Sequence, residues 1–286
     1  MSCTVGFVCD IGASRDRGGR ERNEDNFLVC MDGTVRYHVD GVEVNAVQPG
    51  DGVLVAVCDG MGGHTDGHVA STTATRVLSK LYQPGVPKRP AKVLLSFIQD
   101  SHRQLHTAAK CDGPVEMGTT LTVAWLVGGK CCWAHVGDSR LYLHRNGRLF
   151  QLTADQTRNE FARRDGRAVT PDGEHLVQNF IYGSRGMGDN ASLRLEAGLD
   201  SGAEVLHAGD RLLLCSDGLT GAVPDDVVAL TLARILEPQQ ACARLQEIAL
   251  ERGSRDNVTV VIVRVDEVPK DDVEEWVDDP EETVQF

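Results

Sequence analysis

The chain has 286 residues and a mass of 31.0 kDa, which fits one large domain or two small ones. Its hydrophobic content of 41% is ample for a sizeable core. The net charge of −13 is uneven, because ten acids and one lysine follow Val265 and carry −9, which leaves −4 on the first 265 residues. A mildly acidic body without a basic stripe argues against nucleic acid as a partner.

The sequence shows no sign of a membrane segment or a secretion signal. It has no run of about 18 apolar residues, so no membrane-spanning helix is expected. The start, Met1-Ser2-Cys3-Thr4, has no charged segment followed by an apolar stretch. The nine cysteines form no CxxC pair and many sit within apolar runs, as buried reduced thiols do. We therefore expect a cytoplasmic protein without a zinc site.

The first half of the chain alternates strand-like and helical patterns. Strands are expected at about residues 3–9, 26–31, 34–39, 41–47 and 52–58. Helices are expected from about Asp66 to Tyr82 and from Ala91 to about Lys110, because apolar residues recur there at helical spacing. Strands resume at about residues 119–127, 131–135 and 141–144.

The second half begins with a segment that lacks periodicity. From Thr153 to Asn190 the sequence is charged and glycine-rich, with a short helical patch at about residues 158–164. A stretch of this length without its own core is more often functional than idle. Strands are expected again at about residues 193–197, 211–215 and 257–265, and helices at about 225–236 and 238–252.

This order of elements indicates an α+β fold. Strands in hairpin order, with two helices inserted and two appended, favour antiparallel sheets with helices on the outside. We expect one domain over residues 1–265 and an acidic tail over residues 266–286. The tail is expected to be disordered because acids dominate it.

Acidic residues recur in tight polar or glycine turns beside apolar runs. The turns are Asn23-Glu24-Asp25, Asp59-Gly60-Met61-Gly62-Gly63-His64, Gly137-Asp138-Ser139-Arg140, Ser216-Asp217-Gly218-Leu219 and Arg255-Asp256-Asn257. Carboxylates at the mouths of buried strands repel one another and lose hydration unless cations neutralise them. Oxygen ligands in this number suit magnesium, manganese or calcium rather than zinc. The sequence therefore predicts a site for several hard metal ions.

These turns, with Arg20-Glu21-Arg22 and Gly118-Thr119-Thr120, resemble the metal-dependent Ser/Thr protein phosphatases, the PPM or type 2C family, in its bacterial form. The resemblance covers roughly residues 4–265 and keeps the family's motif order. It implies a four-layer sandwich in which two central antiparallel sheets lie between helix pairs. It also implies hydrolysis of phosphoserine and phosphothreonine in proteins by a metal-activated water, with Mn²⁺ or Mg²⁺ as cofactor and a Ser/Thr kinase as the opposing enzyme.

The turns supply the candidate metal ligands. Asp59 suits a bridging carboxylate because its turn is tight and follows a buried strand. The resemblance adds the Gly60 carbonyl, places Asp217 and Asp256 on one ion and Glu24 on the other, and gives Asp25 the task of orienting metal-bound waters. Taken singly, Asp217 or Asp256 would more often be a turn or helix-cap carboxylate.

Two further residues receive roles from the resemblance. Arg20 matches the phosphate-binding arginine, although Arg15, Arg17 and Arg22 are close by in the chain. Asp138 matches a residue that, with the Asp217 segment, forms a third and weaker metal site. The alternative is a turn with an internal pair between Asp138 and Arg140.

His64 is the weakest of the candidate catalytic residues. In some relatives a histidine directly after Asp-Gly is the proposed acid for the leaving group, but here Met61 holds that place. A loop histidine with no catalytic part is the alternative.

Rival phosphatase and nucleotide-binding chemistries lack their signatures. A cysteine phosphatase needs C-x5-R, but Cys132 and Arg140 lie too far apart for that spacing and Cys111 has no arginine in reach. The sequence has no G-x-S-x-G elbow, and its glycine-rich turns contain neither a Walker motif nor a dinucleotide fingerprint. The remaining alternative is a pseudophosphatase that binds phosphoproteins or scaffolds a complex without turnover. Such a protein is expected to have lost a metal carboxylate, and none of the matched positions is lost.

Two segments are candidates for selecting substrates or partners. In the resembled family, the position of residues 153–190 holds a mobile flap beside the active site. In the tail, Thr283 lies among acids and resembles a kinase target that a phosphothreonine-binding adaptor would read. The alternative for the tail is a solubilising extension.

Overall fold

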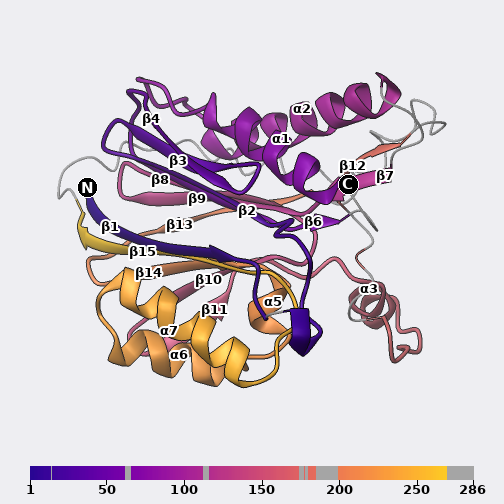
Figure 1. The fold of residues 1–286 in the computed structure, drawn as a ribbon. Coiled ribbons are helices and arrows are strands. Elements are labelled where there is room, and N and C mark those ends of the chain that lie inside the picture. The colour runs from indigo at the N-terminus through magenta and orange to yellow at the C-terminus, as the bar shows by residue number, and fades with distance from the viewer. Residues whose placement is uncertain are drawn as a thin grey trace.

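The computed structural model describes residues 1–13, 15–61, 66–111, 116–173, 177, 180–184 and 199–268. Two large antiparallel sheets lie face to face at its centre (Figure 1). The seven-stranded sheet has the order β13 (Asp200–Val205), β9 (Lys130–Val136), β8 (Leu121–Val127), β5 (Val53–Cys58), β2 (Asn26–Met31), β3 (Thr34–Val39) and β4 (Val42–Val47). The five-stranded sheet has the order β1 (Ser2–Asp10), β15 (Val258–Glu267), β14 (Arg211–Cys215), β10 (Arg140–Arg145) and β11 (Arg148–Gln151).

Helices cover the outer faces of both sheets. The helices α1 (Gly67–Ser79) and α2 (Pro90–Cys111) lie on the seven-stranded sheet, and α6 (Asp225–Arg234) and α7 (Pro238–Glu251) lie on the other (Figure 1). Shorter elements are η1 (Arg15–Arg17), α3 (Arg158–Arg164), α5 (Asp217–Thr220) and a small sheet of β12 (Ile181–Ser184), β7 (Glu116–Thr119) and β6 (Gly60–Met61). The expected α+β, four-layer sandwich is confirmed.

The central strands are buried on both faces, which explains their continuous apolar runs. Along β5, Val53, Val55 and Val57 pack between the two sheets, whereas Leu54, Ala56 and Cys58 face the α1–α2 layer. Side chains that alternate in this way hold each strand in register, since a slip of one residue would exchange the two faces. The strand ends that carry the acidic turns are therefore fixed in space.

Close approach of α7 to the five-stranded sheet depends on one glycine. A Cβ added at Gly6 of β1 would lie 2.2 Å from the backbone nitrogen of Gln239 and 2.4 Å from the carbonyl carbon of Pro238. The Gln239 side chain also exchanges hydrogen bonds with the backbone of Phe7, at 3.1 and 3.0 Å. The start of α7 thus rests directly on the β1 backbone.

Most expected elements are present, with ends that differ by a few residues. The sequence patterns missed β7, β11, β12 and β13, and β15 runs to Glu267, beyond the expected end of the domain at residue 265. The strand expected at residues 193–197 lies outside the described residues. The described helices include none long and apolar enough to cross a membrane. The eight cysteines whose side chains are described are free thiols.

Candidate metal centre

The acidic turns meet because of how the antiparallel strands pair. The start of β2 lies beside the end of β5, with Asn26 opposite Cys58, so Asp25 and Asp59 share one edge of the seven-stranded sheet. In the other sheet β14 and β15 pair with Cys215 opposite Val260, so the end of one strand and the start of the next lie together. That edge carries Asp217 and Asp256.

A buried carboxylate joins the two edges. Asp25 is only 5% exposed, and its Oδ2 accepts hydrogen bonds from Ser216 Oγ at 2.8 Å and Thr259 Oγ1 at 2.7 Å. Both hydroxyl groups belong to the five-stranded sheet and its β14–α5 turn, whereas Asp25 precedes β2 of the other sheet. Asp25 is thus held across the sandwich, with Asp217 and Asp256 near enough to raise its pKa.

Asparagine 257 fixes the segment that carries Glu24. Its side-chain oxygen accepts the Glu24 backbone N–H at 2.9 Å, and its Nδ2 donates to the carbonyls of Ile11 at 3.0 Å and Arg22 at 3.1 Å. These bonds tie the N-terminal segment to the residue that follows Asp256. The Asp256-Asn257 motif in the sequence marked this turn as part of the site. It did not predict that the Asn257 side chain holds the segment of Glu24 in place.

Glycine 60 allows backbone groups to crowd beside Asp59. A Cβ on Gly60 would lie 2.3 Å from the carbonyl oxygen of Glu24 and 2.4 Å from that of Gly67. The Asp59 backbone is held by Thr120, whose Oγ1 accepts from Asp59 N at 2.9 Å and whose N–H donates to Asp59 O at 2.9 Å. A glycine is therefore required here for packing, and its carbonyl stands next to Glu24.

Asp138 approaches from a third direction. It follows β9, is 6% exposed, and sits in a turn where Gly137 has a φ of +113°. The next residue, Ser139, shares a hydrogen bond of 2.7 Å with Thr120. Asp138 thereby comes close to Asp59, and its charge is among those that raise the pKa of Asp59. The alternative to a metal role for Asp138 was an internal pair with Arg140, but the fork of Arg140 binds Asp155.

Burial and mutual repulsion make these carboxylates hard to ionise without a cation. Burial, followed by the charges of Asp25, Asp217, Asp138 and Asp256, raises the pKa of Asp59 well above its ordinary value. Burial raises the pKa of Asp25 to about 7 and that of Asp138 to about 8, and Asp217 adds to both shifts. A group of acids that holds its protons this strongly is one that cations would stabilise.

Arg20 is the arginine that reaches this group. Its Nη2 donates to Asp256 Oδ2 at 2.6 Å, and the hydrogen bond to Asp256 is the main reason that the pKa of Arg20 is raised. Asp59 and Asp217 also contribute to that shift. Of the neighbouring arginines, Arg15 forms an ion pair with Glu21. Arg22 contacts His68, and its charge, like that of Arg20, opposes the rise that burial causes in the pKa of Glu24.

The donor set fits hard divalent cations. It consists of carboxylates and backbone carbonyls, which are the ligands that magnesium and manganese prefer. Within the described part of the chain, no three His, Cys, Asp or Glu side chains already have the geometry of a formed metal site. The charges of Asp217 and Asp256 raise the pKa values of Asp25 and Asp59, so these side chains lie near one another and would have to close in around ions. His64 lies outside the described residues.

Comparison with known proteins gives the same family throughout. A sequence model described as protein phosphatase 2C matches residues 40–250. The serine/threonine protein phosphatase PstP of Mycobacterium tuberculosis is 36% identical over 217 residues, which cover 74% of this chain and 40% of PstP. The match therefore spans less than half the length of that relative. The serine/threonine phosphatase stp of Listeria monocytogenes is 31% identical over 262 residues, covering 88% of this chain and 94% of the other.

A solved structure shares the fold. The catalytic domain of PstP, crystallised with two manganese ions, superposes with a TM-score of 0.71 and 31% identity, and the alignment covers 93% of this chain and 99% of that domain.

Proposed function

We infer that the chain, which belongs to the protein phosphatase 2C family, hydrolyses phosphoserine and phosphothreonine in proteins with manganese or magnesium ions as cofactors. The observation that carries this proposal is the meeting of Asp25, Asp59, Asp217 and Asp256 from two different sheets, with Arg20 on Asp256. The charges of Asp25, Asp217 and Asp256 raise the pKa of the buried Asp59, and such a cluster brings no structural benefit without cations. The two manganese ions in the PstP catalytic domain fit such a site.

Each residue has a proposed role. Asp59 would ligate both ions, with Asp217 and Asp256 on one of them and Glu24 on the other. The Gly60 carbonyl would supply a further ligand. Asp138 would contribute to a third and weaker site. When bound, the ions polarise the phosphoryl oxygens and activate water as the nucleophile.

The remaining groups bind and orient. Arg20 would turn its planar fork from Asp256 to the phosphate oxygens, which a lysine cannot hold in the same way. Asp25 would orient water, since Ser216 and Thr259 fix one of its oxygens. A pseudophosphatase is expected to lack a metal carboxylate, but every expected acidic position is present, which favours an active enzyme.

Activity is expected to depend strictly on metal ions. The chain offers carboxylates for ions but no G-x-S-x-G serine. The two cysteines at a C-x5-R spacing, Cys9 and Cys30, are poor nucleophiles because burial raises the pKa of each thiol. Hydrolysis of p-nitrophenyl phosphate and of a phosphothreonine peptide should vanish in EDTA and return with Mn²⁺. No labelled phosphoenzyme should accumulate after rapid acid quenching. Full activity in EDTA, or a trapped covalent intermediate, would refute the mechanism.

The tail carries a separate proposal, although residues 269–286 lie outside the described part of the chain. We place the end of the phosphatase domain near Val268, because β15 continues to Glu267. We propose that the acidic segment beyond it, with Thr283, recruits the opposing Ser/Thr kinase or a phosphothreonine-binding adaptor.

The nine cysteines, without a disulfide among the described ones, support action in the reducing cytoplasm.

Removal of the tail separates catalysis from recruitment. A chain ending at Val268 should retain the full rate on p-nitrophenyl phosphate, because β15 and the candidate metal ligands remain. It should lose recovery of the partner kinase in pull-downs, and Thr283→Ala in the full chain should do the same. Unchanged recovery with both variants would indicate a solubilising tail.

A further inference from the structure

The loop that carries Asp138 is bound to the segment leading into α3. Gly137 exchanges two hydrogen bonds with Gln156: its carbonyl accepts from the Gln156 N–H at 2.8 Å, and its N–H donates to Gln156 Oε1 at 3.0 Å. Leu141 does the same with Leu152 and Thr153, at 2.8 and 3.0 Å. Residues 152–156 are therefore hydrogen-bonded along the loop that carries Asp138. Helix α3 begins two residues after this segment.

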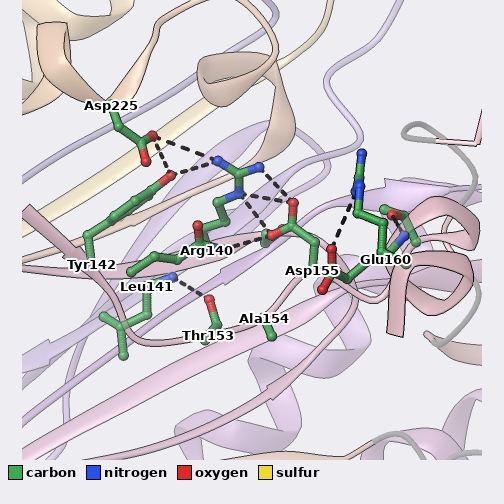
Figure 2. Close-up of polar contacts among 12 residues, drawn as sticks. Arg140, Leu141, Tyr142, Thr153, Ala154, Asp155, Glu160 and Asp225 are labelled. Atoms are coloured by element: carbon green, nitrogen blue, oxygen red, sulfur yellow. Dashed lines mark hydrogen bonds and ion pairs between the residues drawn. The ribbon is translucent and has the colours of Figure 1, made fainter. Parts of the chain in front are cut away.

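Arg140 closes this attachment with every nitrogen of its guanidinium group (Figure 2). Nε and Nη2 donate to the two carboxylate oxygens of Asp155 at 2.8 and 2.7 Å. Nη1 donates to the hydroxyl of Tyr142 at 2.8 Å, and that hydroxyl donates to Asp225 Oδ1, at the start of α6, at 3.0 Å. Gln151 adds a hydrogen bond to Asp155 at 3.0 Å.

This network joins the turn that carries Asp138 to the segment that leads into α3. The Arg140 and Asp155 side chains are 24% and 22% exposed, so water competes only weakly with their pairing. Together with Thr157, Glu160 and other residues, they line a groove of about 510 Å³ at the base of α3. Arg140 is only two residues from Asp138 and begins β10, so it lies at the end of the turn that carries Asp138.

We propose that Arg140 is a positioning residue whose fork on Asp155 fixes the Asp138 carboxylate and the start of α3 as one body, and so sets the affinity of the metal site that contains Asp138. The proposal rests on the proposed ligand role of Asp138. It assigns to this arginine a task that a single charge cannot perform, because three donors in a plane are used on two different partners. A lysine at this position would keep the charge and lose the geometry.

The chain contains a matched control on the same strand. At the far end of β10, Arg145 forms the same fork on Asp210, with Nε and Nη2 at 2.8 and 2.6 Å from the two carboxylate oxygens. The Arg145 side chain is 25% exposed, against 24% for Arg140. Arg145→Lys therefore removes an equivalent ion-pair geometry away from the metal centre.

The test compares Arg140→Lys and Arg145→Lys by direct Mn²⁺ binding. Free Mn²⁺ is counted by electron paramagnetic resonance during a titration of the full-length protein, and thermal unfolding is followed without metal. Partners of metal ligands typically change affinity by about 10–100-fold. Arg140→Lys should weaken the weakest Mn²⁺ site at least about tenfold and leave the tighter sites within about twofold. Arg145→Lys should leave all sites within that twofold range, whatever its melting temperature. Equal Mn²⁺ binding by the two variants would overturn the proposal.

A double-mutant cycle protects the result against a general loss of structure. Asp155→Asn should weaken the same Mn²⁺ site, and the double variant with Arg140→Lys should be no weaker than the worse single variant, because both remove one unit. Tyr142→Phe removes the hydroxyl that accepts from Nη1 and donates to Asp225 but leaves the fork on Asp155, so it should give a smaller loss. Multiplicative effects of the Arg140 and Asp155 changes would mean that the two side chains do not act together.

A variant of the presumed ligand separates this proposal from the role of Asp138. If Asp138→Asn leaves all Mn²⁺ sites unchanged, both the ligand assignment and the positioning role are wrong. If Asp138→Asn weakens a site but Arg140→Lys matches Arg145→Lys, the ligand assignment holds and only the positioning role fails. If both Asp138→Asn and Arg140→Lys weaken the same site, the proposal stands.

Discussion

Asp59→Asn is expected to inactivate the protein and, at the same time, to stabilise its metal-free form. Loss of a carboxylate that ligates both ions should lower kcat on a phosphothreonine peptide by at least about 100-fold, since metal polarisation contributes several kcal/mol and each 1.36 kcal/mol is a factor of ten. An asparagine of the same shape cannot supply the missing charge.

The stabilising effect follows from the sign of the pKa shift. Burial and four neighbouring aspartates raise the folded-state pKa of Asp59, so folding favours its protonated form. The metal-free fold therefore loses stability as pH rises above about 4, where this acid ionises in the unfolded chain. Asp25 and Asp138, with pKa values raised to about 7 and about 8, extend that loss through neutral pH.

Thermal unfolding in EDTA at pH 7.5 measures this effect. Asp59→Asn should raise the melting temperature by at least about 2 °C, roughly the shift that 1 kcal/mol gives in a large domain. Mn²⁺ should raise the melting temperature of Asp59→Asn much less than it raises that of the wild-type protein. Asp100→Asn, which removes an exposed carboxylate on α2, is the control and should change neither. A destabilised metal-free Asp59→Asn would contradict the electrostatic account.

Gly218→Ala is expected to damage both stability and catalysis. A Cβ at this position would lie 1.9 Å from the carbonyl oxygen of Asn257, a distance that no packing allows, so the backbone segments around Asp217 and Asp256 must separate. Overpacking of this kind costs about 1–3 kcal/mol. A shift of about 1 Å between groups that bind one ion can lower the rate by about 100-fold.

A neighbouring glycine serves as the control. Gly221 follows the same short helix, and its added Cβ would meet only the carbonyl oxygen of Asp217, at 3.0 Å. Gly221→Ala should therefore cost less than about 1 kcal/mol, because a small adjustment relieves the contact. Melting curves and phosphopeptide kinetics on both variants check this. Similar behaviour of Gly218→Ala and Gly221→Ala would show that the approach of the two turns is unimportant.

Sequence reasoning located the central strands and the acidic turns because both depend on local signals. The apolar run at residues 53–58 had to be a strand buried on both sides, and the acid directly after it had to lie at a sheet edge. Pairing of antiparallel neighbours then placed Asp25 beside Asp59. The order of the motifs supplied the rest through the family resemblance.

The missed elements owe their structure to partners far away in the chain. The strand β13, Asp200–Val205, has no run of apolar residues, yet it pairs along its whole length with β9 at the edge of the sheet. The partner of Arg140 was also missed. An arginine two residues from Asp138 suggested a local pair, whereas its fork lies on Asp155, which the sequence placed in a segment without periodicity. Such contacts depend on the tertiary fold, so no regular spacing of residues in the sequence predicts them.

The central claim is that acidic turns from both sheets close around metal ions. The most direct measurement is a crystal structure with Mn²⁺, with data collected at the manganese absorption edge. The account predicts anomalous peaks within bonding distance, about 2.0–2.6 Å for hard cations, of Asp59, Asp217 and Asp256 oxygens, with one ion also bound by Glu24. Anomalous peaks elsewhere on the protein, with Arg20 still paired to Asp256 and the carboxylates apart, would contradict it.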